Sequence, residues 1–423
     1  MAEIQPLRAL HYDLERVTSL ADVIAPPYDV VDPGQRAALL RRSPHNVVAL
    51  DLPEPTAAEP DRYAHAAGLL QQWTSDGILV RDDVPALWAL EQEFTGPDGA
   101  TRTRRGFFAR VRVTDYGPGQ IRPHERTHPG PKADRLSLTQ ATRANLSPIF
   151  SLFDDPRQRV AGLLQDTFAD APFGEATDDE GTHNRVWRTT DPEVIAGVQA
   201  ALAQTELLIA DGHHRYETAR AYADEIGGEG DHRYVLMQLV AMQDEGLVVH
   251  PTHRLVSGLA GDSARQEALA AALREHFDIT EIAHADLRPE PGGGPLQLGY
   301  IDSHFKRAFR CELKTQAIAD AALPGMPDAY RTLDTAVLEA LILKGPLGLT
   351  EDDISHLNGL GYARTDDEAL ARVLDGTYDC AFFLRPSPVD QVRAVAATGV
   401  NMPPKSTFFY PKVPTGLLLS PLA

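Results

Sequence analysis

A short apolar run that passes directly into a glycine turn and then into a helix limits the folds open to this chain. Leu207 to Ala210 predicts a short buried strand, and Gly227-Gly228 marks the end of the following helix. Between strand and helix stands Asp211-Gly212-His213-His214-Arg215. The helix has one apolar face, formed by Tyr216, Ala219, Ala223 and Ile226. A buried strand followed at once by an amphipathic helix predicts an α/β protein with a mixed sheet.

The turn from Asp211 to Arg215 combines groups that bind a polyphosphate. The first N–H groups of a helix attract anions, Gly212 lets the backbone approach a ligand, and Arg215 offers a cationic fork. His213 and His214 can donate hydrogen bonds to phosphate oxygens, and Asp211 could orient one of them or help to hold Mg²⁺. We predict a nucleotide site at these five residues. The alternative is that Asp211 only caps the helix while the histidines are exposed.

A second candidate motif is His124-Glu125-Arg126-Thr127, a carboxylate between basic neighbours after Pro123. Glu125 could accept the proton of a substrate hydroxyl there. Phosphoryl transfer needs little more than such a base, positioning and neutralisation of charge. Because a glutamate in a polar loop is more often solvated surface, the motif alone does not decide the matter.

Two further clusters, Pro251–Arg254 and Met402–Lys412, mix cations and hydroxyls with proline or aromatic residues. This composition suits the wall of a pocket for an anion, and it suits aromatic–proline packing equally well. The histidines at His213-His214, His250 and His253 suggest zinc as another hypothesis. Adjacent histidines lack helical ligand spacing, however, and no thiolate accompanies them. We therefore assign no metal ligand.

The charge balance argues against nucleic acid as the ligand. The chain has 40 Lys and Arg against 60 Asp and Glu, a formal net charge of −20 that repels phosphate backbones at long range. It has no convincing helix-turn-helix and no stripe of basic residues. Cys311 and Cys380 stand far apart and outside metal-ligand spacing, which fits a reducing compartment and buried packing roles. With no leader pattern and no run approaching the roughly 20 apolar residues of a membrane span, we expect a cytoplasmic protein.

The length of 423 residues predicts two or three domains. We expect an N-terminal α/β segment over residues 1–100, a nucleotide-binding core over 101–258 and a C-terminal α/β domain over 259–423. The expected helices cover residues 60–73 and the stretch from Asp191-Pro192 to about 205. Strands are expected over 87–94 and 105–113, around a turn at 95–99, and over 146–153. A turn at 25–30 that leaves a strand and a loop at 289–295 complete the expected local elements.

Segments spread over nearly the whole chain resemble a bacterial family called domain of unknown function 1015. They are residues 25–30, 124–127 with Asp134-Arg135, 210–219, 251–254 and 402–412. More widely, the chain is similar to the ParB/sulfiredoxin-like superfamily and, within it, to nucleotide-dependent free serine kinases. Those kinases carry a His-Glu-x-Thr segment, a proline-containing strand and Asp-Gly-His-x-Arg at a helix start. The same order appears here at His124–Thr127, Ser147–Phe150 and Asp211–Arg215.

The resemblance implies a ParB/sulfiredoxin-like nucleotide-binding core whose N- and C-terminal α/β flanks complete a substrate pocket. It implies His124 and Glu125 as catalytic residues, with Glu125 as the base, and Asp211 to Arg215 as the phosphate cradle. The residues expected at the substrate are Thr127, Arg254 and Lys405. The expected cofactors are ATP or ADP with Mg²⁺, and the expected partner is a small hydroxyl compound such as free L-serine, which would become O-phosphoserine.

Other functions give different expectations. A nucleotide-sensing protein would bind tightly without turnover. A ParB-like, DNA-associated role follows from the name of the fold alone, and fold does not imply function. A sulfiredoxin-like repair activity needs a nucleophilic cysteine in the phosphate turn, where His213 stands. We therefore expect a small-molecule phosphotransferase, with a nucleotide-sensing or DNA-associated binding protein as the alternative.

Overall fold

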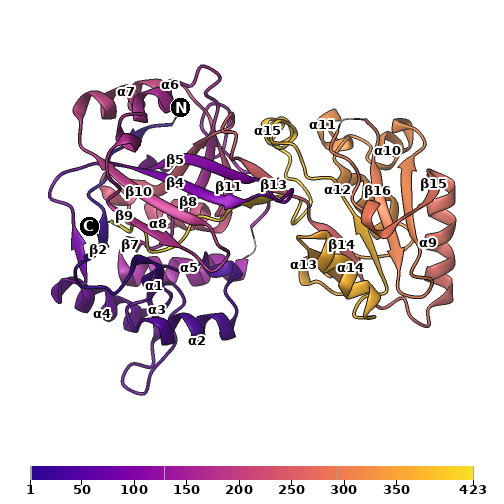
Figure 1. Ribbon diagram of the computed structural model, residues 1–423, viewed down its shortest axis with the longest axis horizontal. Helices are drawn as coiled ribbons and strands as arrows, with labels where there is room; N and C mark the ends of the chain where they lie inside the picture. The colour runs from indigo at the N-terminus through magenta and orange to yellow at the C-terminus, as the bar shows by residue number, and fades with distance from the viewer. Residues whose placement is uncertain (1, 128, 293, 423) are drawn as a thin grey trace. The chain divides into compact units, whose positions relative to one another are not determined.

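The computed structural model describes residues 2–127, 129–292 and 294–422, which divide into two compact units (Figure 1). The first unit comprises Met1–Pro123, Thr127–Val248 and Pro411–Ala423, and the second comprises His124–Arg126 and Val249–Tyr410. The chain therefore leaves the first unit and returns to it for the final segment. The expected boundary at residue 100 falls inside a hairpin of the first unit, between Thr95 and Thr101.

A nine-stranded mixed sheet forms the centre of the first unit, in the order β6-β11-β8-β12-β5-β4-β10-β9 with β1 paired to β5. The pairs β11–β6 and β12–β8 are parallel and the other pairs of this sheet are antiparallel. Its strands are β1 (Ile4–Gln5), β4 (Leu87–Thr95), β5 (Thr101–Arg112), β6 (Ile121–Arg122), β8 (Ile149–Phe153), β9 (Gly174–Thr177), β10 (His183–Thr189), β11 (Leu207–Asp211) and β12 (Tyr234–Ala241). The pairs β2 (Leu10–Tyr12) with β3 (Leu79–Arg81) and β7 (Ala144–Asn145) with β21 (Ser420–Pro421) stand beside it.

Successive side chains of a strand point to opposite faces of the sheet, so the alternation of apolar and polar residues determines which face is buried. Phe107, Ala109 and Val111 of β5 are fully buried in a core with residues of α6, α7 and α8, whereas Arg110 and Arg112 are half-buried on the other side. The helices of the unit are α1 (Leu20–Val23), α2 (Pro33–Arg42), α3 (Val48–Asp51), α4 (Arg62–Ser75), α5 (Pro129–Thr142), α6 (Arg159–Leu164), α7 (Pro192–Leu202) and α8 (His213–Ile226). Figure 1 shows the sheet between α6 and α7 on one side and α1 to α4 on the other.

Most of the expected local elements are confirmed with shifts of a few residues. The helix near 60–73 is α4, the hairpin strands are β4 and β5, and the side chain of Asp191 caps α7 by accepting from the N–H of Glu193. Two expectations are wrong. Ile226 is 52% exposed at the end of α8, so it lies off the apolar face. The segment before the 25–30 turn is the helix α1, because Ser19 caps a helical turn there.

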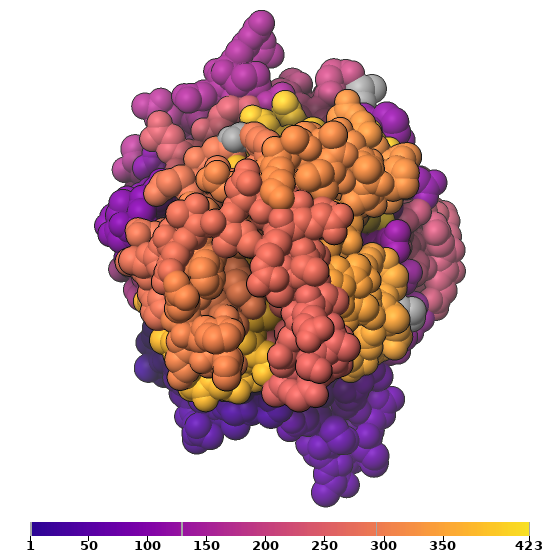
Figure 2. Space-filling model, turned by 90° about the vertical axis from the view of Figure 1, so that its right-hand side faces the viewer, coloured from indigo at the N-terminus to yellow at the C-terminus, as the bar shows by residue number. Residues whose placement is uncertain are grey.

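An antiparallel six-stranded sheet, in the order β15-β17-β16-β19-β14-β18, forms the second unit. Its strands are β14 (His253–Val256), β15 (Phe277–Ile282), β16 (Gln297–Asp302), β17 (Ala308–Leu313), β18 (Leu360–Ala363) and β19 (Cys380–Phe383), and β13 (Val248–His250) pairs with β20 (Phe408–Tyr410). Its helices are α9 (Ser263–His276), α10 (Gln316–Ala322), α11 (Asp328–Arg331), α12 (Asp334–Leu338), α13 (Glu351–His356), α14 (Asp366–Leu374) and α15 (Val389–Ala397). The surface of this unit, salmon to yellow, faces the viewer in Figure 2.

The environment of the two cysteines and the character of the helices can be compared with the expectations from the sequence. Cys311 and Cys380 are both buried in the core of the second unit. Burial raises the pKa of the Cys311 thiol to about 12 and raises that of Cys380 as well. Across the described residues, every helix is too short or too polar to traverse a bilayer.

Candidate functional site

The predicted phosphate turn stands between β11 and α8 of the first unit. β11 ends at Asp211, and Gly212 has φ 96°, a left-handed conformation that favours glycine. Gly212 is the N-cap of α8, and as a glycine it has no side chain with which to cap the helix. The alternative in which Asp211 merely caps the helix is therefore wrong, because its carboxylate binds elsewhere.

The carboxylate of Asp211 lies between two cations. Its Oδ2 accepts a hydrogen bond from Arg215 Nη2 at 2.5 Å, and its Oδ1 accepts one from Lys412 Nζ at 2.5 Å. Burial alone would raise the pKa of this carboxyl, but Lys412 and Arg215 outweigh burial and hold the pKa below its usual range. Asp211 is therefore ionised, and the three side chains together carry one net positive charge at the amino end of α8.

Several contacts hold the side chain of Arg215. Its Nη1 donates to Ser147 Oγ at 2.9 Å and to the carbonyl of Pro148. The guanidinium lies against the bare backbone of Gly212, where an added Cβ would stand 3.0 Å from Arg215 Nε. Ser147 Oγ is in turn 2.8 Å from Thr415 Oγ1. The absence of a side chain at Gly212 thus allows both the left-handed turn and the close approach of the Arg215 guanidinium.

Lys412 reaches Asp211 because its backbone is held by a buried polar chain on the sheet. Gln92 Nε2 donates to the Lys412 carbonyl at 3.1 Å, and Arg104 donates both to Gln92 Oε1 and to the Pro411 carbonyl. The Arg104 guanidinium also lies over the Phe150 ring, 4.4 Å from its centre. Strands β4, β5 and β8 therefore position a residue that comes 201 positions after Asp211.

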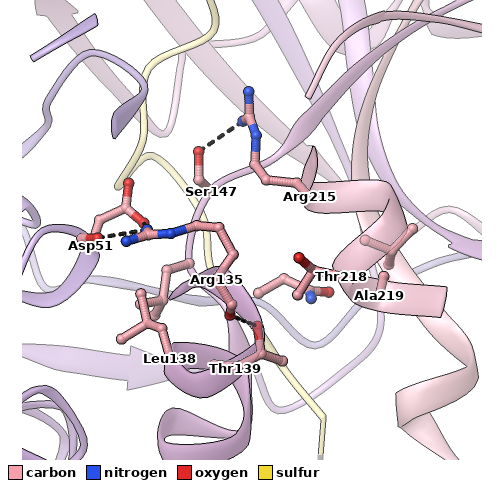
Figure 3. A pocket seen from close by; sticks show the side chains of 12 residues that line it. Asp51, Arg135, Leu138, Thr139, Ser147, Arg215, Thr218 and Ala219 are labelled. Atoms are coloured by element: carbon pink, nitrogen blue, oxygen red, sulfur yellow. Dashed lines mark hydrogen bonds and ion pairs between the residues drawn. The ribbon is translucent and has the colours of Figure 1, made fainter. Parts of the chain in front are cut away.

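A second buried ion-pair cluster adjoins Arg215 (Figure 3). Arg135 of α5 donates to Asp51 Oδ1 at 3.0 Å and to Asp134 Oδ2 at 2.6 Å, and it lies over the ring of Tyr28 at 4.3 Å. Burial raises the pKa of Asp51, and Arg135 and Arg215 partly oppose that rise. Burial likewise raises the pKa of Tyr28 to about 12. Segments 25–30, 134–135 and 211–215, which lie far apart in the sequence, thus meet in one network.

A cavity of about 40 Å³ lies between these two clusters, lined by Arg135, Ser147, Arg215 and Thr218 among others. Figure 3 shows that the two arginines come from different elements, with Arg135 directed at Asp51 and Arg215 at Ser147. Among the described atoms, Thr218 Oγ1 and Arg215 Nε are buried without a hydrogen-bond partner. A water needs roughly 10–15 Å³, so this space suits bound water rather than a nucleotide.

The remaining predicted residues belong mainly to the second unit. His124 is fully buried, with Nε2 2.8 Å from Thr407 Oγ1, and Glu125 is half-buried. Arg254 is 2% exposed and donates to the carbonyls of Thr252, Pro404 and Lys405.

Electrostatics link two of these residues. Burial lowers the pKa of Arg254, and the charges of Tyr362, Glu339 and Glu125 oppose that change. The side chain of Lys405 is exposed, and Thr127 begins the second segment of the first unit. The structure thus gathers 211–215 in one unit and gathers His124, Glu125, Arg254 and Lys405 in the other.

Three residues of the first-unit network were not predicted as site residues. Lys412 belongs to the cluster 402–412 described above, but its pairing with Asp211 joins residues that are 201 positions apart. Asp51 lies in an apolar stretch, so no local pattern marked it. Arg135 was visible only through the family resemblance.

The described residues do not supply a Mg²⁺ site at Asp211. Both of its oxygens accept hydrogen bonds from cations, which exclude a metal ion from the same lone pairs. Among the described residues, no cluster of three or more His, Cys, Asp and Glu side chains could hold a metal. The expected role of Asp211 in holding Mg²⁺ does not fit this arrangement.

A larger cavity of about 740 Å³ lies in the first unit near the start of β5 and the ends of β8 and β12. Its charged lining is largely paired internally. Glu91, 5% exposed, accepts from Arg105 at 2.7 Å and lies 3.4 Å from Arg185. We assign it no role in the phosphate site, with which it shares no residue.

Comparison with known proteins gives a family and several distant structures. The family model described as "Protein of unknown function (DUF1015)" matches residues 4–335. No curated protein matches the chain. Similar solved structures include a free serine kinase in complex with AMP, with 13% identity over 68% of this chain and 83% of that chain and a TM-score of 0.34.

Two further solved structures are similar at the same level. C-terminally truncated SbnI from Staphylococcus aureus has 11% identity over 74% of this chain and 86% of that chain, with a TM-score of 0.37. A conserved hypothetical protein from Pyrococcus furiosus has 15% identity over 70% and 89%, with a TM-score of 0.34. Likenesses at this level leave the function to be argued from the residues.

Proposed function

Because the chain belongs to the family described as protein of unknown function DUF1015, whose description assigns no reaction, we propose from its residues that it is a nucleotide-dependent kinase of a small hydroxyl compound. Free L-serine is the acceptor to test first, because the order of the three motifs resembles that of the free serine kinases. A ParB/sulfiredoxin-like core is part of the same proposal.

The observation that carries the proposal is the pair of cations at the amino end of α8. Arg215 and Lys412 are both held there by Asp211, beside the left-handed Gly212. The N-terminus of a helix adds partial positive charge, which attracts phosphate. In a chain with a net charge of −20, such a local excess of positive charge supports a phosphate ligand.

In the proposed reaction, the acceptor hydroxyl attacks the terminal phosphorus of ATP or ADP as Glu125 takes its proton. The bond from that phosphorus to the bridging oxygen breaks, and the nucleotide leaves with one phosphate fewer. Glu125 is half-buried, and its interaction with Arg254 opposes the effect of burial on the pKa of that arginine, which supports placing the two residues in one site. His124, Thr127, Arg254 and Lys405 remain proposed members of the substrate site.

The experiment that tests the proposal follows phosphate transfer by phosphorus NMR. Full-length protein is incubated with ATP or ADP, magnesium and L-serine or a panel of small alcohols, and nucleotide affinity is measured separately. We expect a serine-dependent O-phosphoserine signal. Tight nucleotide binding without transfer to any acceptor would contradict the kinase proposal and favour a nucleotide-sensing function. Binding to DNA in preference to nucleotide would favour the DNA-associated alternative.

Variants separate the two proposed roles. Glu125→Gln is expected to abolish transfer and leave nucleotide affinity nearly unchanged, with Glu275→Gln on the exposed face of α9 as the matched control. Arg215→Ala is expected to weaken nucleotide binding, with Arg220→Ala in the same helix as its control. An equal loss of nucleotide affinity in Glu125→Gln and Arg215→Ala would overturn the assignment of roles.

A further inference from the structure

Three arginines from separate parts of the first unit line one surface hollow of about 270 Å³. Arg8 lies between β1 and β2, Arg81 ends β3, and Arg110 belongs to β5. Backbone pairing brings them together, because Gln5 pairs with Arg110 and Leu10 pairs with Arg81. The rest of the lining is Pro6, Pro85, Asp231, Ser420 and Pro421.

The hollow carries an excess of positive charge. Of the eight described residues that line it, Asp231 is the acidic one, and it pairs with Arg110 Nη1 at 2.5 Å. Arg8 and Arg81 are exposed, and neither forms an ion pair with another described residue. Three guanidinium groups against one carboxylate leave two positive charges, in a chain whose net charge is −20.

Arg110 is held in place at the hollow by two contacts. Its guanidinium lies over the Tyr234 ring at 5.2 Å while Nη1 binds Asp231. Its Nε is buried and has no acceptor among the described residues. This nitrogen has almost no exposed surface, so a ligand in the hollow would act on Arg110 through the charge of its guanidinium.

We propose that this hollow binds a small phosphate monoester. A monoester carries a charge of about −1.5 to −2 near neutral pH, which matches the excess of two, whereas a carboxylate or sulfate monoester would leave one cation uncompensated. Guanidinium forks bind phosphate oxygens in pairs. The volume of about 270 Å³ lies just below the range of about 300–1,000 Å³ usual for ligand sites, which fits a small ligand.

This site is independent of the proposed kinase. It shares no residue with the cluster of Asp211, Arg215 and Lys412. Failure of phosphate transfer to serine therefore leaves the proposal standing, and failure of monoester binding at the hollow leaves the kinase standing.

Isothermal titration calorimetry of the full chain with methyl phosphate tests the proposal. Methyl sulfate is the matched ligand, because it has the same shape and a single negative charge. We expect saturable binding of methyl phosphate, at least about tenfold tighter than that of methyl sulfate. The double variant Arg8→Ser/Arg81→Ser is expected to weaken methyl phosphate binding by roughly tenfold or more, because it removes two charged donors.

The control variant Arg41→Ser/Arg157→Ser removes two other exposed arginines of the same unit and the same total charge. It is expected to bind methyl phosphate like the wild type. The proposal is overturned if methyl phosphate does not bind saturably, if methyl sulfate binds equally well, or if both double variants lose the same affinity. If the Arg8→Ser/Arg81→Ser variant bound methyl phosphate as tightly as the wild-type protein does, the ligand would bind elsewhere, and this result would also overturn the proposal.

Discussion

Replacing Arg135 by leucine tests the reasoning on the buried network most directly. The side chains of Arg135 and Asp51 are each 6% exposed, and Arg135 also pairs with Asp134 and covers the ring of Tyr28. Removing one partner of a buried ion pair leaves an uncompensated charge and costs about 3–5 kcal/mol of the free energy of unfolding. For a urea slope of about 3 kcal/mol/M, this loss lowers the midpoint by roughly 1–1.7 M.

The loss should depend on pH in a defined direction. Burial already raises the pKa of Asp51 in the folded protein, and loss of Arg135 raises it further. Between the ordinary value of about 3.9 and this raised pKa, the folded state binds more protons than the unfolded state, so stability falls as pH rises through that window. The deficit of Arg135→Leu is therefore expected to be small near the lower end of the window and complete above the raised pKa.

Tryptophan fluorescence is a suitable assay because Trp73, Trp88 and Trp187, the three tryptophans of the chain, all belong to the first unit. Adding Asp51→Asn to Arg135→Leu should recover much of the loss, because the buried charge is then gone. Arg62→Leu is the control, since it removes the 47%-exposed partner of Asp134 and should cost no more than about 1 kcal/mol. A midpoint for Arg135→Leu equal to that of the control, or no recovery in the double variant, would refute the reasoning.

Three further predictions concern other parts of the structure. Gly212→Ala places a Cβ against the guanidinium of Arg215, so it should weaken the proposed nucleotide binding and lower the stability to urea. The control is Gly181→Ala, because Gly181 has a similar φ of 82° but its added Cβ would have no atom within 4 Å. Equal losses of stability in the two variants would contradict the packing argument. Lys412→Met removes a cation from the carboxylate that it holds ionised, so it should cost about 1.5–3 kcal/mol of the free energy of unfolding near neutral pH. The cost should become smaller as pH falls below the ordinary carboxyl pKa towards the lowered pKa of Asp211, as urea midpoints will show, and a deficit that grows in acid would contradict it. Cys311 and Cys380 should resist alkylation in the native protein and react only as the second unit unfolds, and fast labelling without denaturant, read by mass spectrometry, would be inconsistent with their burial.

The sequence predicted the local elements well where composition and periodicity agree. The Asp191-Pro192 start of α7 and the Gly227 end of α8 follow from capping chemistry that acts within a few residues. The turn at 211–215 was predicted as a unit for the same reason. The predicted burial of Ile226 was wrong because the last turn of α8 extends past the core against which the helix packs.

Long-range contacts explain what the sequence left out. The pairing of Lys412 with Asp211 requires the final segment to return to the first unit after the whole second unit. No periodicity marks such a return, and the expected boundaries at residues 100 and 258 took no account of it. Asp51 was missed for a related reason, since its partner Arg135 lies 84 positions away.

The return of residues 411–422 to the first unit has a consequence for biosynthesis. Lys412 binds Asp211, Thr415 pairs with Ala25, and Leu419 pairs with Leu10, so the first unit lacks these contacts until the ribosome has passed them. The 201 positions from Asp211 to Lys412 take roughly 10–40 s to translate at about 5–20 residues per second. During that interval the carboxylate of Asp211 has Arg215 but lacks its second cation, so the charge arrangement at the start of α8 is complete only late in the synthesis of the chain.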